Sequence, residues 1–485
     1  MRLDEYSRFD AVGLSELVVA GEVTPAELQQ CALDAHAQVH PLINAVVDVH
    51  PHDAGTLPTV GPLAGVPTMV KDLFHGQAGL PCGNGSRLSA DWIVPRRTQI
   101  YARATAAGMV SIGRTTTSEF GILGTTETLA QGLTRSPWSA DHMAGGSSGG
   151  AGAVVGAGVV PVALASDGGG SIRIPAAACG VVGLKPGRGR VPWGLHLKEP
   201  LLGWAVQFAM TRSVRDAALL LDVLGGPTPG DHEGVDRPEL PFAQAARSPV
   251  RPLRIAWWSH PWSGHDPDPV VTEATAATAT LLERLGHRVE VDTPTFSWEA
   301  YLQAMTDVWA STNAHTVDGL AAALGREVNA DTVEGATLAM VEYGRRVTAI
   351  QLLNAIDVET GLTYLMTEFF SRYDVLLTPT LGAVLPRVGH YDPVALTEPR
   401  DMFATWSKWE SFLPVFNTTG QPAISLPLHQ TADGLPIGMQ LVAGAGQEAL
   451  LLALAAQLEE ALPWSDRRPP AYAGWVAPSL SARAT

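Results

Sequence analysis

A glycine-rich stretch from residue 145 to residue 180 constrains this chain more than any other part of the sequence. Two serine-bearing glycine turns, at residues 145–150 and 167–171, flank a run of Ala, Val and Gly. Glycine permits positive φ and close approach of the backbone, so such turns occur where main-chain N–H groups converge on a small group. Residues 149–165 carry almost no polar side chains, which predicts a buried helix leading into a strand that brings the two turns together.

Ser171 ends the second turn, directly after Gly168, Gly169 and Gly170. We expect it to lie amid several backbone N–H groups, which can stabilise a developing oxyanion by about 10²–10³ in rate per donor. A flexible Gly/Ser linker would not carry long apolar runs between its glycines. A phosphate loop needs a lysine directly after its second glycine, whereas the nearest lysine, Lys185, follows a leucine. The turn is therefore interpreted as the site of a nucleophile.

A serine nucleophile needs a base, and no histidine-based partner is evident near this stretch. Lys71 ends the apolar, strand-like run of residues 62–70. Burial lowers the pKa of a lysine and makes its neutral amine a usable base. Taken alone, a lysine after an apolar run is more often a surface residue whose stem packs along the protein. Both interpretations stay open on this residue alone.

Four motifs occur in order along the chain: G-x-P-x-x-V-K-D at 65–72, G-G-S-S-G-G at 145–150, D-x-G-G-S at 167–171 and C-G-x-x-G-L-K-P at 179–186. Ser147 follows Lys71 by 76 residues, and Ser171 follows Ser147 by 24. In these motifs and spacings the chain resembles the amidase signature family of Ser-cisSer-Lys hydrolases. The resemblance covers nearly the whole chain and is strongest over residues 60–225.

The resemblance implies a role for each of these residues. Ser171 would be the nucleophile, Ser147 would follow a cis peptide bond and relay the proton, and Lys71 would be the ultimate base. The backbone N–H groups of residues 168–171 would form the oxyanion hole. Gly121 would lie where a family backbone group faces the substrate. The chemistry implied needs neither a metal nor a cofactor.

The chain departs from the family at two supporting places. Arg114 and Thr116 stand where the family has Lys and Asn, in a turn beside the acyl group of the substrate. Many members have Thr, Ile or Ala at the position of Gly168, and glycine makes the turn more mobile. We expect Asp167 and Arg173 to brace the two glycine turns.

The fold expected is a single large α/β domain spanning residues 1–485. Alternating strands and helices, with apolar strands that lack a polar face, predict a mixed, mostly buried β-sheet covered by helices on both faces. Residues 226–415 are expected to form a more variable substrate-pocket region. Within it, amphipathic patterns predict helices over residues 310–324, 332–355 and 362–373.

Charge and composition limit the partners. A net charge of −16 argues against nucleic acid and anionic membranes. Hydrophobic residues make up 46% of the chain, as in a soluble protein with a large core. Three cysteines without C-x-x-C spacing, no signal-peptide core and no convincing membrane span predict a cytoplasmic protein. Its expected partner is a small-molecule amide or carbamate, and a homodimer is one option for its assembly.

Four functions remain open. The first is an amidase for small, largely apolar amides, with anilides the best single substrate class. The second is a carbamate (urethane) hydrolase with the same triad, and the third is a glutamine-dependent amidotransferase subunit that acts with a partner. The fourth is a scaffold without activity, which the complete set of Lys71, Ser147 and Ser171 disfavours.

The pocket is expected to be apolar and to favour uncharged groups. The three-glycine turn is expected to leave room at the rim of the oxyanion hole for a bulky or planar carbonyl, such as that of a carbamate. Arg326, Arg345 and Arg346 stay open as partners for a carboxylate. The candidate lining residues are Trp309, Leu320, Met340, Leu352, Leu353, Met402, Phe403, Trp406 and Trp409.

Overall fold

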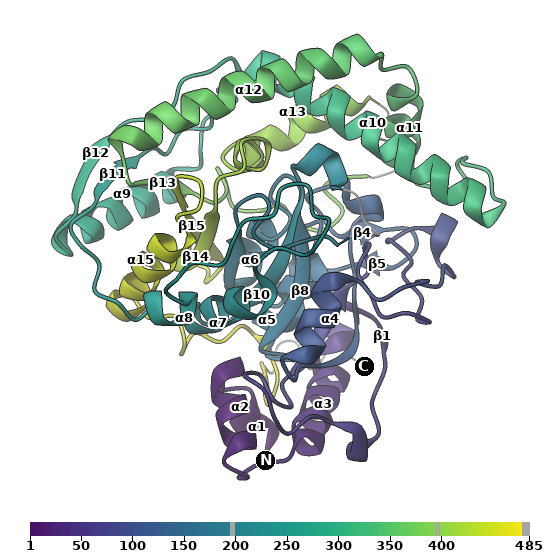
Figure 1. Ribbon diagram of the computed structural model, residues 1–485, viewed down its shortest axis with the longest axis vertical. Helices are drawn as coiled ribbons and strands as arrows, with labels where there is room; N and C mark the ends of the chain where they lie inside the picture. The colour runs from purple at the N-terminus through teal and green to yellow at the C-terminus, as the bar shows by residue number, and fades with distance from the viewer. Residues whose placement is uncertain (195–198, 393–394, 396–397, 478–485) are drawn as a thin grey trace.

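The computed structural model describes residues 1–194, 199–392, 395 and 398–477. An 11-stranded mixed sheet runs through the molecule, with helices packed around it (Figure 1). This arrangement confirms the predicted α/β class. Across the sheet the strands follow one another as β1 (Val46–Val49), β3 (Val110–Thr115), β2 (Pro67–Lys71), β8 (Val162–Asp167), β10 (Val206–Thr211), β9 (Val182–Lys185), β14 (Ala423–Gln430), β15 (Pro436–Ala443), β13 (Val375–Pro379), β11 (Arg254–Trp257) and β12 (Arg288–Val291).

The neighbouring strands β2 and β8 place the candidate catalytic residues. Every residue of both strands is buried, as expected for apolar strands covered on two faces. The two strands are parallel, with Thr68 opposite Val162, so their carboxyl ends lie at the same edge of the sheet. Lys71 is the last residue of β2 and Asp167 the last of β8.

The predicted helix and strand between the two glycine turns are both present. α5 (Gly149–Gly156) begins directly after the first turn, and β8 follows it and ends at the second turn. The helix is glycine-rich because it packs closely on its neighbours: a Cβ on Gly152 would lie 2.9 Å from the Pro175 Cβ. α6 (Arg173–Cys179) follows the second turn and ends at Gly180, which has a φ of 70°. The helix–strand pair thus returns the chain to the first turn.

The other helices surround the sheet. In Figure 1, a layer on one side of the sheet is formed by α10 (Trp298–Leu324), α11 (Gly335–Gly344), α12 (Ala349–Arg372) and α13 (Pro399–Glu410). At the opposite end, with the N-terminus, lie α1 (Leu3–Tyr6), α2 (Ala11–Val19) and α3 (Pro25–Ile43). Among the described residues, no helix is both long enough and apolar enough to cross a membrane. The other described helices of eight or more residues are α4 (Gln99–Ala106), α7 (Val214–Leu224), α9 (Pro269–Arg284) and α15 (Glu448–Ala461).

The helix boundaries predicted for the variable region are wrong in two ways. α10 begins at Trp298, well before residue 310, because the Ser297 hydroxyl accepts a hydrogen bond from the Ala300 N–H and caps the helix there. α11 and α12 are separated at residues 345–348, and α12 then runs without a break through the predicted gap at 356–361. A capping box between Thr348 and Gln351 starts α12.

Candidate active site

Lys71 is fully buried at the end of β2. Its Nζ lies 2.7 Å from Ser147 Oγ and 3.1 Å from Ser166 Oγ. Burial lowers the pKa of Lys71 to about 7, although the negative charge of Asp167 opposes this shift. The interpretation of Lys71 as a surface residue is therefore wrong, and its amine is held near neutrality within hydrogen-bonding distance of two hydroxyls.

Ser147 lies in the loop that precedes α5, where the Gly146–Ser147 peptide bond is cis. Its side chain is buried, and its hydroxyl contacts Lys71 Nζ. Ser166, near the end of β8, is the other hydroxyl in contact with Lys71. Ser166 was not among the predicted site residues; it directly precedes Asp167, the first residue of the D-x-G-G-S motif, and that adjacency is the signal that could have found it.

The turn that carries Ser171 is folded around the carboxylate of Asp167. Gly170 N–H donates to Asp167 Oδ1 at 2.7 Å, and Ile172 N–H donates to Oδ2 at 3.1 Å. The expectation that Gly170 supplies a free oxyanion donor is therefore wrong, because Asp167 already accepts its N–H. Within the described residues, the N–H groups of the other three turn residues, Gly168, Gly169 and Ser171, have no acceptor.

Asp167 forms a fully buried ion pair with Arg173, as expected. Arg173 Nε and Nη2 each donate to the carboxylate at 2.9 Å, and Nη1 donates to Gln440 Oε1 at 2.8 Å. Asn417 Nδ2 donates to the Asp167 backbone carbonyl at 2.8 Å. Burial alone would raise the pKa of Asp167, but the Arg173 charge holds it well below its usual range. The pair therefore ties the nucleophile turn to β15 and to the segment before β14.

Two adjoining cavities share Ser171, Gly121 and Trp309 in their walls. The serine cavity is also lined by Leu73, Phe74, Phe120, Ser147, Ser166, Gly168, Trp193, Pro200, Leu201, Ala205, Thr312, Asn313 and Thr316. The tryptophan cavity is also lined by Ile122, Leu123, Gly124, Gly169, Ile174, Trp298, Met305, Phe403, Trp406, Ser407, Glu410, Ser411 and Pro414.

Gly121 lies between the two cavities. Its φ is 74°, and a Cβ at this position would lie 2.8 Å from Leu73 Cδ2 and 3.5 Å from Ser147 Oγ. Glycine is thus required both by the backbone conformation and by the close approach to Leu73. The turn backbone therefore passes close to the Ser147 hydroxyl.

Arg114 and Thr116, the two departures from the family pattern, both have polar partners in the structure. Arg114 is buried and forms ion pairs with Asp48 and Asp72, which fix β3 to its neighbours β1 and β2. The Thr116 hydroxyl lies 2.7 Å from that of Thr134. Both residues therefore brace the strand ends next to Lys71.

Several expectations about the pocket are wrong. Only Trp309, Phe403 and Trp406 of the candidate lining residues border either cavity, because the others pack in the core or, like Leu353, lie on the surface. Arg326 pairs with Asp91 and Arg345 with Asp318, Arg346 is exposed, and none of the three borders either cavity.

The space expected at the rim of the turn is also filled. A Cβ on Gly168 would lie 2.7 Å from Leu201 Cδ1 and 3.3 Å from the Trp309 indole. Leu201 and Trp309 therefore occupy the volume that the missing side chain was expected to leave for a planar carbonyl. Glycine at position 168 is therefore explained by the close packing of Leu201 and Trp309 against the turn.

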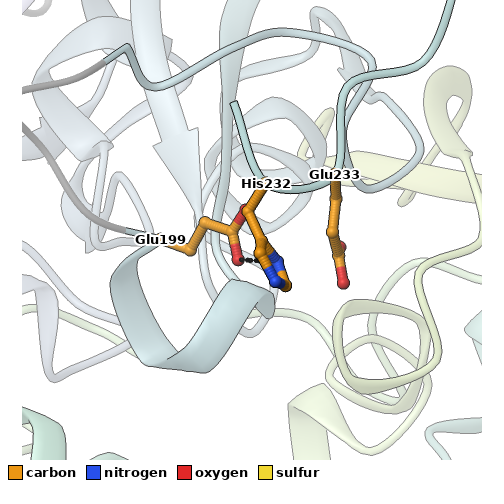
Figure 2. A group of neighbouring side chains, drawn as sticks. All are labelled: Glu199, His232 and Glu233. Atoms are coloured by element: carbon orange, nitrogen blue, oxygen red, sulfur yellow. Dashed lines mark ion pairs between the residues drawn. The ribbon is translucent and has the colours of Figure 1, made fainter. Parts of the chain in front are cut away.

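A second group of polar side chains lies outside these two cavities (Figure 2). Glu199, His232 and Glu233 place their ligand atoms within 4.8 Å of one another. His232 pairs with Glu199 at 3.6 Å, and Glu233 pairs with Arg188 at 3.7 Å. Because His232 is 83% exposed and the carboxylates already have partners, we assign no metal to this group.

Comparison with known proteins agrees with the fold and the motifs. The sequence profile of the family described as Amidase matches residues 30–452. The chain belongs to the amidase signature family. It is 37% identical over 477 residues to the putative amidase AmiC of Mycobacterium tuberculosis, covering 95% of this chain and 96% of that one. As a member of this family, the protein is an amidase, a hydrolase of carbon–nitrogen bonds.

Two solved structures of this family are similar along nearly the whole chain. A 6-aminohexanoate cyclic dimer hydrolase complexed with substrate superposes with a TM-score of 0.88 at 34% identity, covering 96% of this chain and 99% of that one. A bacterial aryl acylamidase superposes with a TM-score of 0.85 at 28% identity, covering 94% and 97%. The fold of this chain is therefore that of the amidase signature structures.

Proposed function

We propose that this amidase hydrolyses small, largely apolar amides through Ser171, Ser147 and Lys71. The observation that carries the proposal is the fully buried Lys71, whose Nζ lies 2.7 Å from the Ser147 hydroxyl and whose pKa burial lowers to about 7. No described carboxylate forms an ion pair with Lys71, and a buried, unpaired lysine with a lowered pKa can serve as a base. Ser147 and Ser171 border the same cavity, as a proton relay and a nucleophile acting on one substrate require.

The proposed reaction begins with proton transfer. Ser147 accepts the proton of the Ser171 hydroxyl and passes its own to the neutral amine of Lys71. Ser171 Oγ then bonds to the carbonyl carbon, and the carbonyl electron pair moves to oxygen. The unpaired N–H groups of Gly168, Gly169 and Ser171 are the candidates for stabilising this oxyanion.

The tetrahedral intermediate then collapses and the carbon–nitrogen bond breaks. Ser147 donates a proton to the departing nitrogen and recovers one from Lys71, which matters because an amine leaves poorly unless protonated. An ester on Ser171 remains. Water attacks this ester with its proton passing along the same two residues, and the carboxylic acid is released.

The walls of the tryptophan cavity support anilides as the preferred substrates. Trp298, Trp309, Phe403 and Trp406 provide planar aromatic surface next to Ser171, which suits an aryl group. An aryl acylamidase is among the similar structures. These residues all lie within residues 226–415, so we propose that this region sets substrate choice. Aryl carbamates are the second candidate, since their hydrolysis needs no further residue.

The test is a comparison of kcat/KM for an acyl anilide, an aryl carbamate and glutamine under identical conditions. We expect the anilide to be preferred, the carbamate to follow, and a metal chelator to leave the rates unchanged. Preference for glutamine, or turnover only with an added partner subunit, would contradict the proposal and favour an amidotransferase.

A further inference from the structure

Glu410, in the wall of the tryptophan cavity, is a carboxyl group without a partner among the described residues. Its Oε1 is buried and accepts no hydrogen bond from any described residue, and its carboxylate forms no ion pair there. Tyr391, whose pKa is raised by burial and by the Glu410 charge, also leaves its hydroxyl unpaired. A buried acceptor in this state costs about 1–3 kcal/mol, and more if charged, so a structural role does not explain it.

The local sequence does not favour a carboxylate at this position. Glu410 is the last residue of α13, where the negative end of the helix dipole opposes a negative charge. Space for the carboxyl group exists only because residue 124 is glycine: a Cβ on Gly124 would lie 1.7 Å from Glu410 Oε1. Residues that break local rules without a structural gain are concentrated at functional sites.

The charges around Glu410 indicate which kind of ligand would pair with its carboxyl group. Burial raises the pKa of Glu410 to about 8, with the charge of Asp167 adding to the shift and no cation opposing it. The wall of the same cavity carries the indoles of Trp309 and Trp406, and aromatic rings attract cations within about 6 Å. Among the described residues, Ser411 Oγ in the same wall also lacks a partner, as do the indole N–H groups of Trp309 and Trp406. A positively charged group would satisfy both acceptors and contact the aromatic rings.

From this arrangement we infer that the tryptophan cavity binds a protonated amine on the substrate, paired with the carboxylate of Glu410. The inference rests on the proposed function, because it treats Ser171 in the same wall as the reacting group. It differs from the expectation of a pocket that favours uncharged groups. The substrates are then amides that are largely apolar but carry a basic nitrogen on the part that enters this cavity.

Two pairs of substrates test the inference, because either side of the scissile bond could enter the cavity. The first pair is 4-(aminomethyl)benzoyl anilide and 4-ethylbenzoyl anilide, in which an ammonium replaces a methyl group. The second pair carries the same two substituents on the aniline ring of an acetanilide. For one pair, we expect the wild-type enzyme to prefer the ammonium compound by about 10-fold or more in kcat/KM, which corresponds to about 1.4 kcal/mol.

Glu410→Gln should reduce this preference by on the order of 10-fold, because the amide keeps the shape but removes the charge. Glu342→Gln, which removes the same charge from an exposed position on α11, should leave the preference unchanged. Glu410→Asp keeps the charge and should retain part of the preference. If Glu410→Gln does not fold, the wild-type ratios decide the question: preference for the ethyl compound in both pairs overturns the inference.

A binding measurement separates this inference from the proposed function. Benzylammonium should slow fluorophosphonate labelling of the wild-type enzyme, benzyl alcohol should be weaker, and Glu410→Gln should remove the difference. Equal protection by both compounds overturns the inference, as do substrate ratios that Glu410→Gln leaves unchanged. Hydrolysis of the ethyl anilides without any ammonium preference would leave the proposed function standing, whereas failure to hydrolyse any amide would overturn the proposed function.

Discussion

The lowered pKa of Lys71 leads to a quantitative prediction of how kcat/KM depends on pH. At pH 7 a lysine with the ordinary pKa of 10.5 is neutral in about 0.03% of molecules, whereas a pKa of about 7 makes about half of them neutral. Burial therefore raises the population of the base by on the order of 10³. Because the neutral form is the active one, kcat/KM for an uncharged anilide should rise about tenfold per pH unit below about pH 6 and level off above about pH 8.

Two variants test whether Lys71 is the group whose titration controls kcat/KM. Lys71→Met should lower kcat/KM by about 10²–10⁴ and leave no rise near pH 7. Lys185 is the matched control, because burial and the charge of Arg173 lower its pKa to about 7 as well. Its Nζ donates to the Pro186 carbonyl at 3.0 Å and to neither catalytic serine, so Lys185→Met should keep the inflection. A flat profile between about pH 5 and about pH 8, or loss of the inflection in Lys185→Met alone, would refute the assignment.

Three further variants probe the relay and the nucleophile turn. Ser147→Ala should abolish amide turnover but leave weak fluorophosphonate labelling, measured by mass spectrometry, because it removes the proton relay and not the nucleophile. Arg173→Met should lower the free energy of unfolding by about 3–5 kcal/mol in urea titration, since it leaves the fully buried Asp167 unpaired; a loss below about 1 kcal/mol would contradict this. Gly170→Ala should cost about 1–2 kcal/mol more stability than Gly168→Ala, because Gly170 has a φ of 136°; equal losses would show that the turn relaxes.

Features that depend on interactions between residues close together in the chain could be predicted from the sequence. The two glycine turns, the intervening helix and strand, and the last residues of β2 are set by neighbours along the chain, so their positions follow from pattern and motif. Thr24 and Glu27 form the capping box that starts α3, as residue spacing alone predicts. The burial of Lys71 could not be predicted from neighbouring residues alone, because only the parallel pairing of β2 with β8 buries it beside Ser147.

The remaining features depend on contacts between segments far apart in the chain. Glu410 is recognisable as unusual only after α13 has packed against Gly124, and no local pattern records that contact. Whether the Gly170 N–H donates to Asp167 depends on the backbone conformation of the turn. The candidate pocket residues were predicted from their apolar character, but most of them are apolar because they pack in the core of the α10–α13 layer. Composition does not distinguish a residue that lines a cavity from one that packs beneath it.

The most direct test of the proposed mechanism is to locate the covalent bond to the enzyme. Wild-type protein, Ser171→Ala and the matched control Ser166→Ala would be treated with a fluorophosphonate and mapped by peptide mass spectrometry. We predict an adduct on Ser171 in the wild type and in Ser166→Ala, and neither an adduct nor amide hydrolysis in Ser171→Ala. An active-site serine that is still labelled in Ser171→Ala, or amide hydrolysis that survives in it, would contradict the assignment of Ser171 as the nucleophile.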